Sequence, residues 1–144
     1  MTAEKVFTIK NYPDDVYTAV GKIIRLSQEW ERDFKRLAAM LEVGIDKIEK
    51  RSLNKLNEAL KKEKKFSGKE FSDLQSVIDK RNDINHTFFL EEFGKDYESY
   101  DDRIAQLERV LNETWFLICE ATDVICNRID ALNGGTVMRP TVFD

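Results

Sequence analysis

The 144-residue sequence predicts an all-α protein, a four-helix bundle with two long and two shorter helices. Apolar residues recur at helical spacing along most of the chain, and no stretch shows the alternation of a half-buried strand. Only two prolines and six glycines interrupt the sequence, and 35% of its residues are charged, a composition that suits long solvent-facing helices. The length is that of one domain.

The first predicted helix follows an extended or frayed lead-in at residues 1–12. Pro13, Asp14 and Asp15 are typical of a helix start, because proline fits the first turn and acids favour the positive end of the helix dipole. The helix is expected to end at Met40 or Leu41. Its inward positions repeat at a 4-3-4-3 spacing that indicates bundle core or a dimer face: Val16, Val20, Ile23, Ser27, Trp30, Phe34, Leu37 and Leu41.

Two shorter helices are expected next. One follows Gly44 and covers residues 45–65, with one apolar side made of Ile45, Ile48, Leu53, Leu56 and Leu60. The other starts after Ser67, which with Glu70 forms a capping-box pattern, and its apolar face is Phe71, Leu74, Val77 and Ile78. Arg81 falls on that inward face, so it needs a partner, a place at the end of the core, or a second chain.

The last predicted helix runs from Asp101 to Leu132. An aromatic and acidic connector with Phe88, Phe89, Phe93, Tyr97 and Tyr100 precedes it, and these rings either cover the core or meet a partner. The helix carries a long apolar stripe, and Asn133-Gly134-Gly135 is a stop signal. We therefore expect a helical domain at residues 13–133 and a tail at 134–144.

Charge is unevenly distributed along the chain. From Lys47 to Lys69 there are nine Lys or Arg and three Glu, a local charge of +6, and Glu91 to Asp102 carries −5. Both runs are interpreted first as solvated surface. The alternative for the basic run is a patch that attracts a polyanion such as RNA, for which the clustered Lys61, Lys62, Lys64 and Lys65 are weak candidates.

The sequence favours a cytoplasmic protein without cofactor, metal or membrane association. No apolar stretch approaches the ~20 residues needed to span a bilayer, and charges at Glu4, Lys5 and Lys10 interrupt any signal-peptide pattern. Cys119 and Cys126 would lie about 10 Å apart along one helix, too far for a disulfide. Free thiols suit a reducing compartment, and one histidine with two helix-bound cysteines does not make a metal cluster.

The stretch from Lys80 to His86 holds the residue types that can act on a phosphodiester without a metal. Arg81 can bind a phosphate by a two-pronged contact and stabilise the charge that develops on it. His86, the only histidine, can exchange a proton with a hydroxyl near neutral pH, and Asn82 can orient either partner. On an ideal helix Arg81 and His86 point about 140° apart, so they share one site only if the helix ends between them or two chains contribute. The intervening Asn and Asp residues favour such an end.

The pattern Arg81-Asn82-x-x-x-His86, at the end of a short helix in an all-helical chain, resembles the signature of the HEPN superfamily. The resemblance implies a bundle of four helices and a homodimer that brings two copies of the motif together. It also implies, in active members, a metal-independent endoribonuclease of toxin or defence systems, with Arg81, Asn82 and His86 as the motif residues. One branch has a modified tyrosine two residues after the histidine; here that residue is Phe88, which puts such regulation in doubt.

Glu31 is a further candidate, because it adjoins the inward Trp30 and an acid there would orient Arg81 or His86. The simpler interpretations are a solvent-exposed Glu31, a His86 that caps its helix, and an Arg81 that pairs with Glu91 or Glu92 of the connector. The leading hypothesis is a homodimeric endoribonuclease that leaves a 2′,3′-cyclic phosphate. The alternatives are a non-catalytic helical module that binds a protein partner, such as an antitoxin, immunity or inhibitor protein, and an RNA-binding protein that does not cleave.

Overall fold

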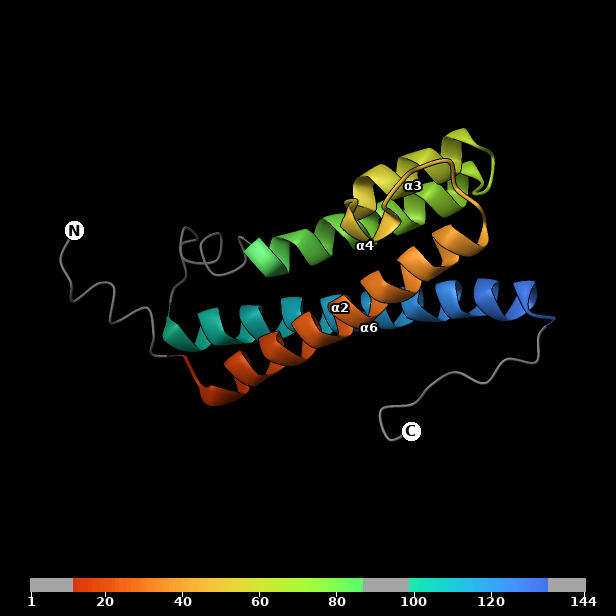
Figure 1. Cartoon of the computed structure of the whole chain (residues 1–144). Coiled ribbons are helices and arrows are strands. Elements are labelled where there is room, and N and C mark those ends of the chain that lie inside the picture. The colour runs from red at the N-terminus through yellow and green to blue at the C-terminus, as the bar shows by residue number, and fades with distance from the viewer. Residues whose placement is uncertain (1–11, 87–98, 135–144) are drawn as a thin grey trace.

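The computed structural model describes residues 12–86 and 99–134, and within these ranges the chain is all-α, with no strand. The elements are α2 (Asp14–Met40), the 3-10 turn η1 (Ile48–Lys50), α3 (Leu53–Lys62), α4 (Gly68–His86) and α6 (Tyr100–Leu132). The predicted bundle of two long and two shorter helices is confirmed. In Figure 1 the long α2 and α6 lie side by side and run in the same direction, while α3 and α4 form an antiparallel pair on one side of them.

The first helix begins and ends as predicted. The Val16 N–H donates to the Pro13 carbonyl at 3.0 Å, and Asp14 and Asp15 occupy the first turn. The inward positions from Val16 to Leu37 are buried, with Ser27 satisfied by donating to the Ile24 carbonyl at 2.8 Å. After Leu41, the positive φ of Glu42 turns the chain away from the helix.

The predicted helix at residues 45–65 was wrong in its first half. The chain instead forms a turn and η1, and α3 starts only at Leu53, with the Ser52 side chain accepting from the Lys55 N–H at 3.2 Å. The left-handed backbone at Lys47 and the extended Arg51 break any continuous helix. The five-residue step from Ile48 to Leu53 departs from the 3-4 repeat, and it marks this break in the sequence.

The start of α4 is the predicted capping box. The Glu70 N–H donates to Ser67 Oγ at 3.1 Å, and the Ser67 N–H donates to Glu70 Oε1 at 3.0 Å. Arg128 of α6 also binds Glu70, and its guanidinium lies 5.4 Å from the centre of the Phe66 ring. This polar cluster fixes the beginning of α4 against the end of α6.

The expectation that α4 ends within the Asn and Asp residues after Arg81 was wrong. The helix has 19 residues and continues through Asn82, Asp83 and Asn85 to His86. The helix-propensity cost of those three residues is at most about 2 kcal/mol in total. Ile84, between them, is only 6% exposed, and burying such a side chain contributes about 1.5–3 kcal/mol. Packing therefore outweighs local preference, and α4 is longer than predicted.

The long α6 begins at a Ser99 cap, whose side chain accepts from the Asp102 N–H at 3.1 Å. Its predicted stripe lies in the core at most positions, with Leu107, Leu111, Ile118, Ala121, Ile125 and Ile129 buried, Ile104 and Trp115 partly buried, and Leu132 exposed. The helix stops at Asn133, followed by Gly134 with φ +82°, as its sequence signal predicted.

Aromatic rings at the centre of the bundle hold α2 in place. Trp30 and Phe34 are fully buried, their ring centres are 5.5 Å apart, and Phe34 meets Phe66 edge-on at 6.1 Å. Tyr12, assigned from sequence to the lead-in, is also buried and accepts a hydrogen bond from Arg103. This packing fixes which residues of α2 face α4. In the described ranges, no helix is both long enough and apolar enough to cross a membrane.

Candidate active site

Four polar residues follow one another around the last turns of α4. With about 100° per residue, Asn85 lies about 40°, Asn82 about 100° and His86 about 140° from Arg81. Arg81 faces the bundle and its side chain is 13% exposed, Asn82 and Asn85 are half-buried, and His86 is exposed. Asn82 therefore stands between the buried arginine and the exposed histidine.

Arg81 is held by an ion pair between α4 and α2. Its Nη2 donates to Glu31 Oε1 at 2.7 Å, and its Nη1 donates to Asn82 Oδ1 at 3.0 Å. Glu31 also lies 3.8 Å from Lys35 Nζ, one turn further along α2. A charge as buried as that of Arg81 needs such a partner, because burial without one is costly.

Glu31 thus occupies the place that its position beside Trp30 suggested, in contact with Arg81. The acid expected from the connector, Glu91 or Glu92, lies outside the described residues, as do the connector aromatics other than Tyr100. Tyr100 is the first residue of α6 and is half-exposed. The contact is thus present, and the catalytic role of Glu31 stays a prediction.

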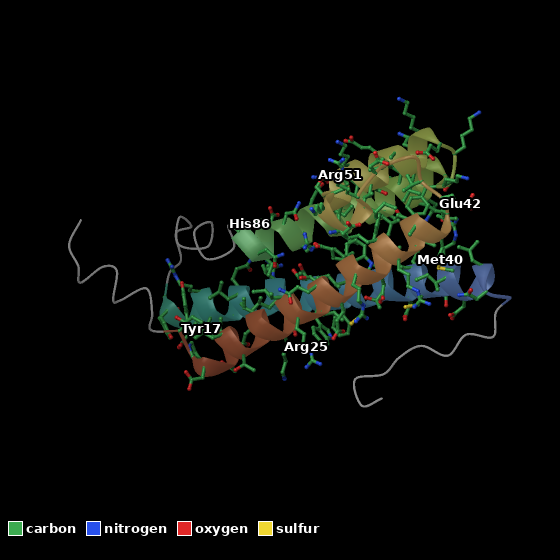
Figure 2. The ribbon with its side chains drawn as sticks, in the orientation of Figure 1. Tyr17, Arg25, Met40, Glu42, Arg51 and His86 are labelled. Carbon is green, nitrogen blue, oxygen red and sulfur yellow. The ribbon has the colours of Figure 1, made fainter. Side chains whose placement is uncertain are left out.

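His86 is the last residue of α4, and Figure 2 shows it where the α4 ribbon ends. Because the helix is continuous from Arg81 to His86, the two side chains leave it in different directions. The helix end that was expected to bring them together is absent, so this route to convergence is excluded. The second route, contributions from two chains, stays a prediction.

Hydrogen-bonding capacity remains unused around the Arg81–Glu31 pair. Four side-chain atoms of the described residues are buried without a hydrogen-bond partner: Arg81 Nε, Asn85 Oδ1 and Trp30 Nε1, and, on α3, Asn57 Oδ1. Such atoms are uncommon in folded proteins, and a catalytic role is one of the explanations for them. Asn85 was not among the predicted site residues, although its spacing of four from Arg81 places both on one face of a helix.

An open groove of about 530 Å³ between α2 and η1 includes Glu31 in its lining. It is lined by Gln28, Glu31, Arg32, Lys35, Arg36, Ala39, Ile48 and Glu49. Lys35 Nζ donates to the Glu49 carbonyl at 2.9 Å, which ties α2 to η1 across this groove. The candidate site is therefore continuous with a surface rich in cations.

The four lysines proposed as weak substrate contacts lie elsewhere. Lys61, Lys62, Lys64 and Lys65 are exposed at the turn between α3 and α4, and Lys61 Nζ lies 4.5 Å from the centre of the Phe71 ring. Since α4 has 19 residues, this turn is about 28 Å from His86 along the helix. The structure does not bring these lysines to the Arg81 site.

A second groove, of about 620 Å³, lies between α4 and α6, away from the predicted site residues. Leu74, Val77, Leu117, Ala121 and Val124 form its apolar part, and Phe116 of α6 is 65% exposed.

Cys119 and Cys126 of α6 are free and half-buried, and burial raises the pKa of the Cys119 thiol. Within the described ranges no group of three or more His, Cys, Asp or Glu is arranged to hold a metal ion.

Comparisons of the chain with profiles of known protein families, with curated proteins and with solved structures give no match.

Proposed function

We propose that this protein is a metal-independent endoribonuclease of the HEPN type, active as a homodimer. One observation carries the proposal: the last turns of α4 hold a buried, pre-oriented Arg81 and an exposed His86, with Asn82 between them. Because the two side chains leave the continuous α4 about 140° apart, one copy does not bring both to one phosphate, and we therefore assign Arg81 of one copy and His86 of the other to a shared cleft.

The chemistry follows from the two groups. His86 takes the proton of an RNA 2′-OH, O2′ attacks the adjacent phosphorus, and the bond to O5′ breaks. The O5′ leaving group takes a proton from solvent, so the products are a 2′,3′-cyclic phosphate and a 5′-OH end. Arg81 stabilises the negative charge that grows on the phosphate oxygens.

The contacts of Arg81 are compatible with this role. Its guanidinium carries five N–H donors, and Glu31 and Asn82 each accept one of them. The donors left for a phosphate are one N–H on each Nη, because Nε is buried. Fixing the plane of the guanidinium in advance removes an entropic cost of binding a phosphate in two-pronged geometry.

The proposal is tested with purified protein and single-stranded RNA in EDTA. Wild-type protein is expected to cut the RNA and leave 2′,3′-cyclic ends. His86→Ala should lose at least about a hundredfold in rate, the typical contribution of a general base. Its melting temperature should change little, because His86 is exposed.

Ser72→Ala, an exposed substitution on the same helix, is the matched control and should cleave like wild type. Intact RNA after incubation with wild-type protein at several concentrations would refute the proposal. So would a His86→Ala variant as active as wild type.

A second candidate is a non-catalytic helical module that binds a protein partner, such as an antitoxin or immunity protein. The 2.7 Å pair between the buried Arg81 and Glu31 favours it, because such a pair also serves to fix two helices. This candidate predicts that Arg81 and His86 substitutions change folding or association and that no RNA is cut. A third candidate, RNA binding without cleavage, would show steep salt dependence and no product.

A further inference from the structure

The groove beside Glu31 carries more positive charge than the sequence pattern suggested. Arg32, Lys35 and Arg36 line it, and Arg81 neutralises its acid Glu31, which leaves Glu49 as the other acid of the lining. These cations come from α2, outside the basic run of residues 47–69. The groove is therefore a cationic surface distinct from the lysine-rich turn.

The cations of the groove are available to a ligand. The Arg32 side chain is 68% exposed and makes one weak contact, at 3.4 Å, with its neighbour Asp33. Arg36 is exposed, without an ion pair or hydrogen bond to another described residue. The two arginines are four residues apart on one face of α2, about 6 Å along the helix, so that they can meet neighbouring phosphates of one strand.

Lys35 is held over the same groove. Its Nζ donates to the Glu49 carbonyl at 2.9 Å and lies 3.8 Å from Glu31, so that one side of the ammonium is fixed by the protein. An ammonium has three donors, and the remaining one can face a ligand. Glu31 thus links Lys35 on one oxygen with Arg81 on the other, and it joins the groove to the candidate active site.

We infer that this groove, the α2–η1 groove, binds the phosphate backbone of the RNA strand next to the scissile phosphate, through Arg32, Lys35 and Arg36. The lining contains Ala39 and Ile48 but no aromatic side chain, so base stacking has no platform there. Contacts to the RNA backbone without base stacking predict an RNA affinity that depends strongly on salt concentration and little on base sequence. The inference rests on the proposed function, because it takes RNA as the ligand.

The test uses a fluorescent single-stranded RNA and His86→Ala protein, so that binding is measured without cleavage. Arg32→Gln/Arg36→Gln added to this background is expected to weaken binding about tenfold at low salt. The slope of log affinity against log salt should fall by about 1.4, since each phosphate contact on a single strand contributes about 0.7. The loss should be similar for RNAs of different sequence.

Two matched double variants distinguish the groove from general charge. Arg25→Gln/Arg109→Gln removes the same charge from exposed sites outside the groove, where Arg25 pairs with Glu29 and Arg109 with Gln106. Lys62→Gln/Lys64→Gln removes it from the lysine-rich turn. Both are expected to bind within about twofold of the parent and to keep its salt slope.

The inference is overturned if the Arg32/Arg36 variant binds like the parent, or if either control loses as much affinity. If the wild-type enzyme cuts RNA, and Arg32→Gln/Arg36→Gln protein with His86 intact binds and cuts RNA equally well, the inference is wrong and the proposed function stands. If the wild-type protein neither binds nor cuts RNA, the inference and the proposed function are both wrong.

Discussion

At the scale of single residues, the most informative contact is the ion pair between Arg81 and Glu31. It joins residues 50 positions apart and links α4 to α2. Its partners are unequally buried, with side chains 13% and 27% exposed. Removing the acid therefore leaves a largely buried cation alone, whereas removing the cation leaves an acid that still has Lys35 nearby.

This asymmetry gives a stability prediction. Glu31→Gln should lower the free energy of unfolding by about 2 kcal/mol, less than for a fully buried pair because water reaches Glu31. Arg81→Met, which keeps the aliphatic packing, should lower the free energy of unfolding by less than Glu31→Gln does. The double variant should be more stable than the sum of the two changes implies, with a coupling of about 1 kcal/mol.

Urea unfolding of the wild type, the two single variants and the double variant measures the coupling. If the free energy of unfolding falls with urea at the same slope in all four, only the stability has changed. Arg25→Met is a matched control, because Arg25 pairs with Glu29 on the exposed side of α2. It should cost no more than about 0.5 kcal/mol. Strict additivity of the Arg81 and Glu31 effects would contradict the view that this pair joins α2 to α4.

The sequence indicated part of this residue-level arrangement. The inward direction of Arg81 and the position of Glu31 beside Trp30 both follow from helical periodicity. The identity of the partner does not, because it depends on how α2 and α4 cross, and that is decided by the packing of Trp30, Phe34 and their neighbours. The role of Lys35 and the groove was missed for the same reason.

At the scale of elements, all four described helices were predictable, but the bounds of the two shorter ones were predicted only in part. α2 and α6 keep one apolar stripe over 27 and 33 residues, so the helical pattern is unambiguous. The region before α3 offers too few turns to separate a helix from a turn. In α4 the Asn and Asp residues suggested an end, but burial of Ile84 and the contacts of Arg81 carry the helix on to His86.

The start of α4 provides a prediction about pH. Burial acts to raise the pKa of Glu70, but hydrogen bonds from Ser67 and the charge of Arg128 outweigh it, and the pKa lies below its ordinary value of 4.5. A carboxylate with a lowered pKa in the folded state stabilises the protein above its unfolded pKa. That contribution is lost as the pH falls through the folded value.

Glu70→Gln should therefore melt at a lower temperature than wild type at pH 7. The difference should shrink as the pH falls below about 4.5. Melting curves by circular dichroism between pH 7 and pH 3 measure it. Glu58→Gln, an exposed change on α3, is the control and should follow wild type throughout. A Glu70→Gln difference that stays constant or grows toward acid would contradict the assignment.

At the scale of the whole molecule, the proposed cleavage requires two copies of the chain. All four described helices contribute to the core, α4 contacts both α2 and α6, and the continuous α4 sends Arg81 inward and His86 outward. A two-fold symmetric pair of chains places equal surfaces face to face, and it is the arrangement that most homodimers adopt. Under the proposed function, activity is therefore a property of two copies, and each cleft shares residues from both.

Mixing two inactive variants tests this central claim most directly. Arg81→Lys keeps a cation for Glu31 but loses the two-pronged phosphate contact, and His86→Ala lacks the base, so each alone should be inactive. When the two variants are mixed in equal amounts and exchange subunits, half of the dimers contain one chain of each, and each of these has one intact cleft out of two. RNA cleavage should therefore recover to about a quarter of the wild-type rate. No recovery from variants that are folded and exchange subunits, alongside active wild-type protein, would contradict a cleft shared between two chains.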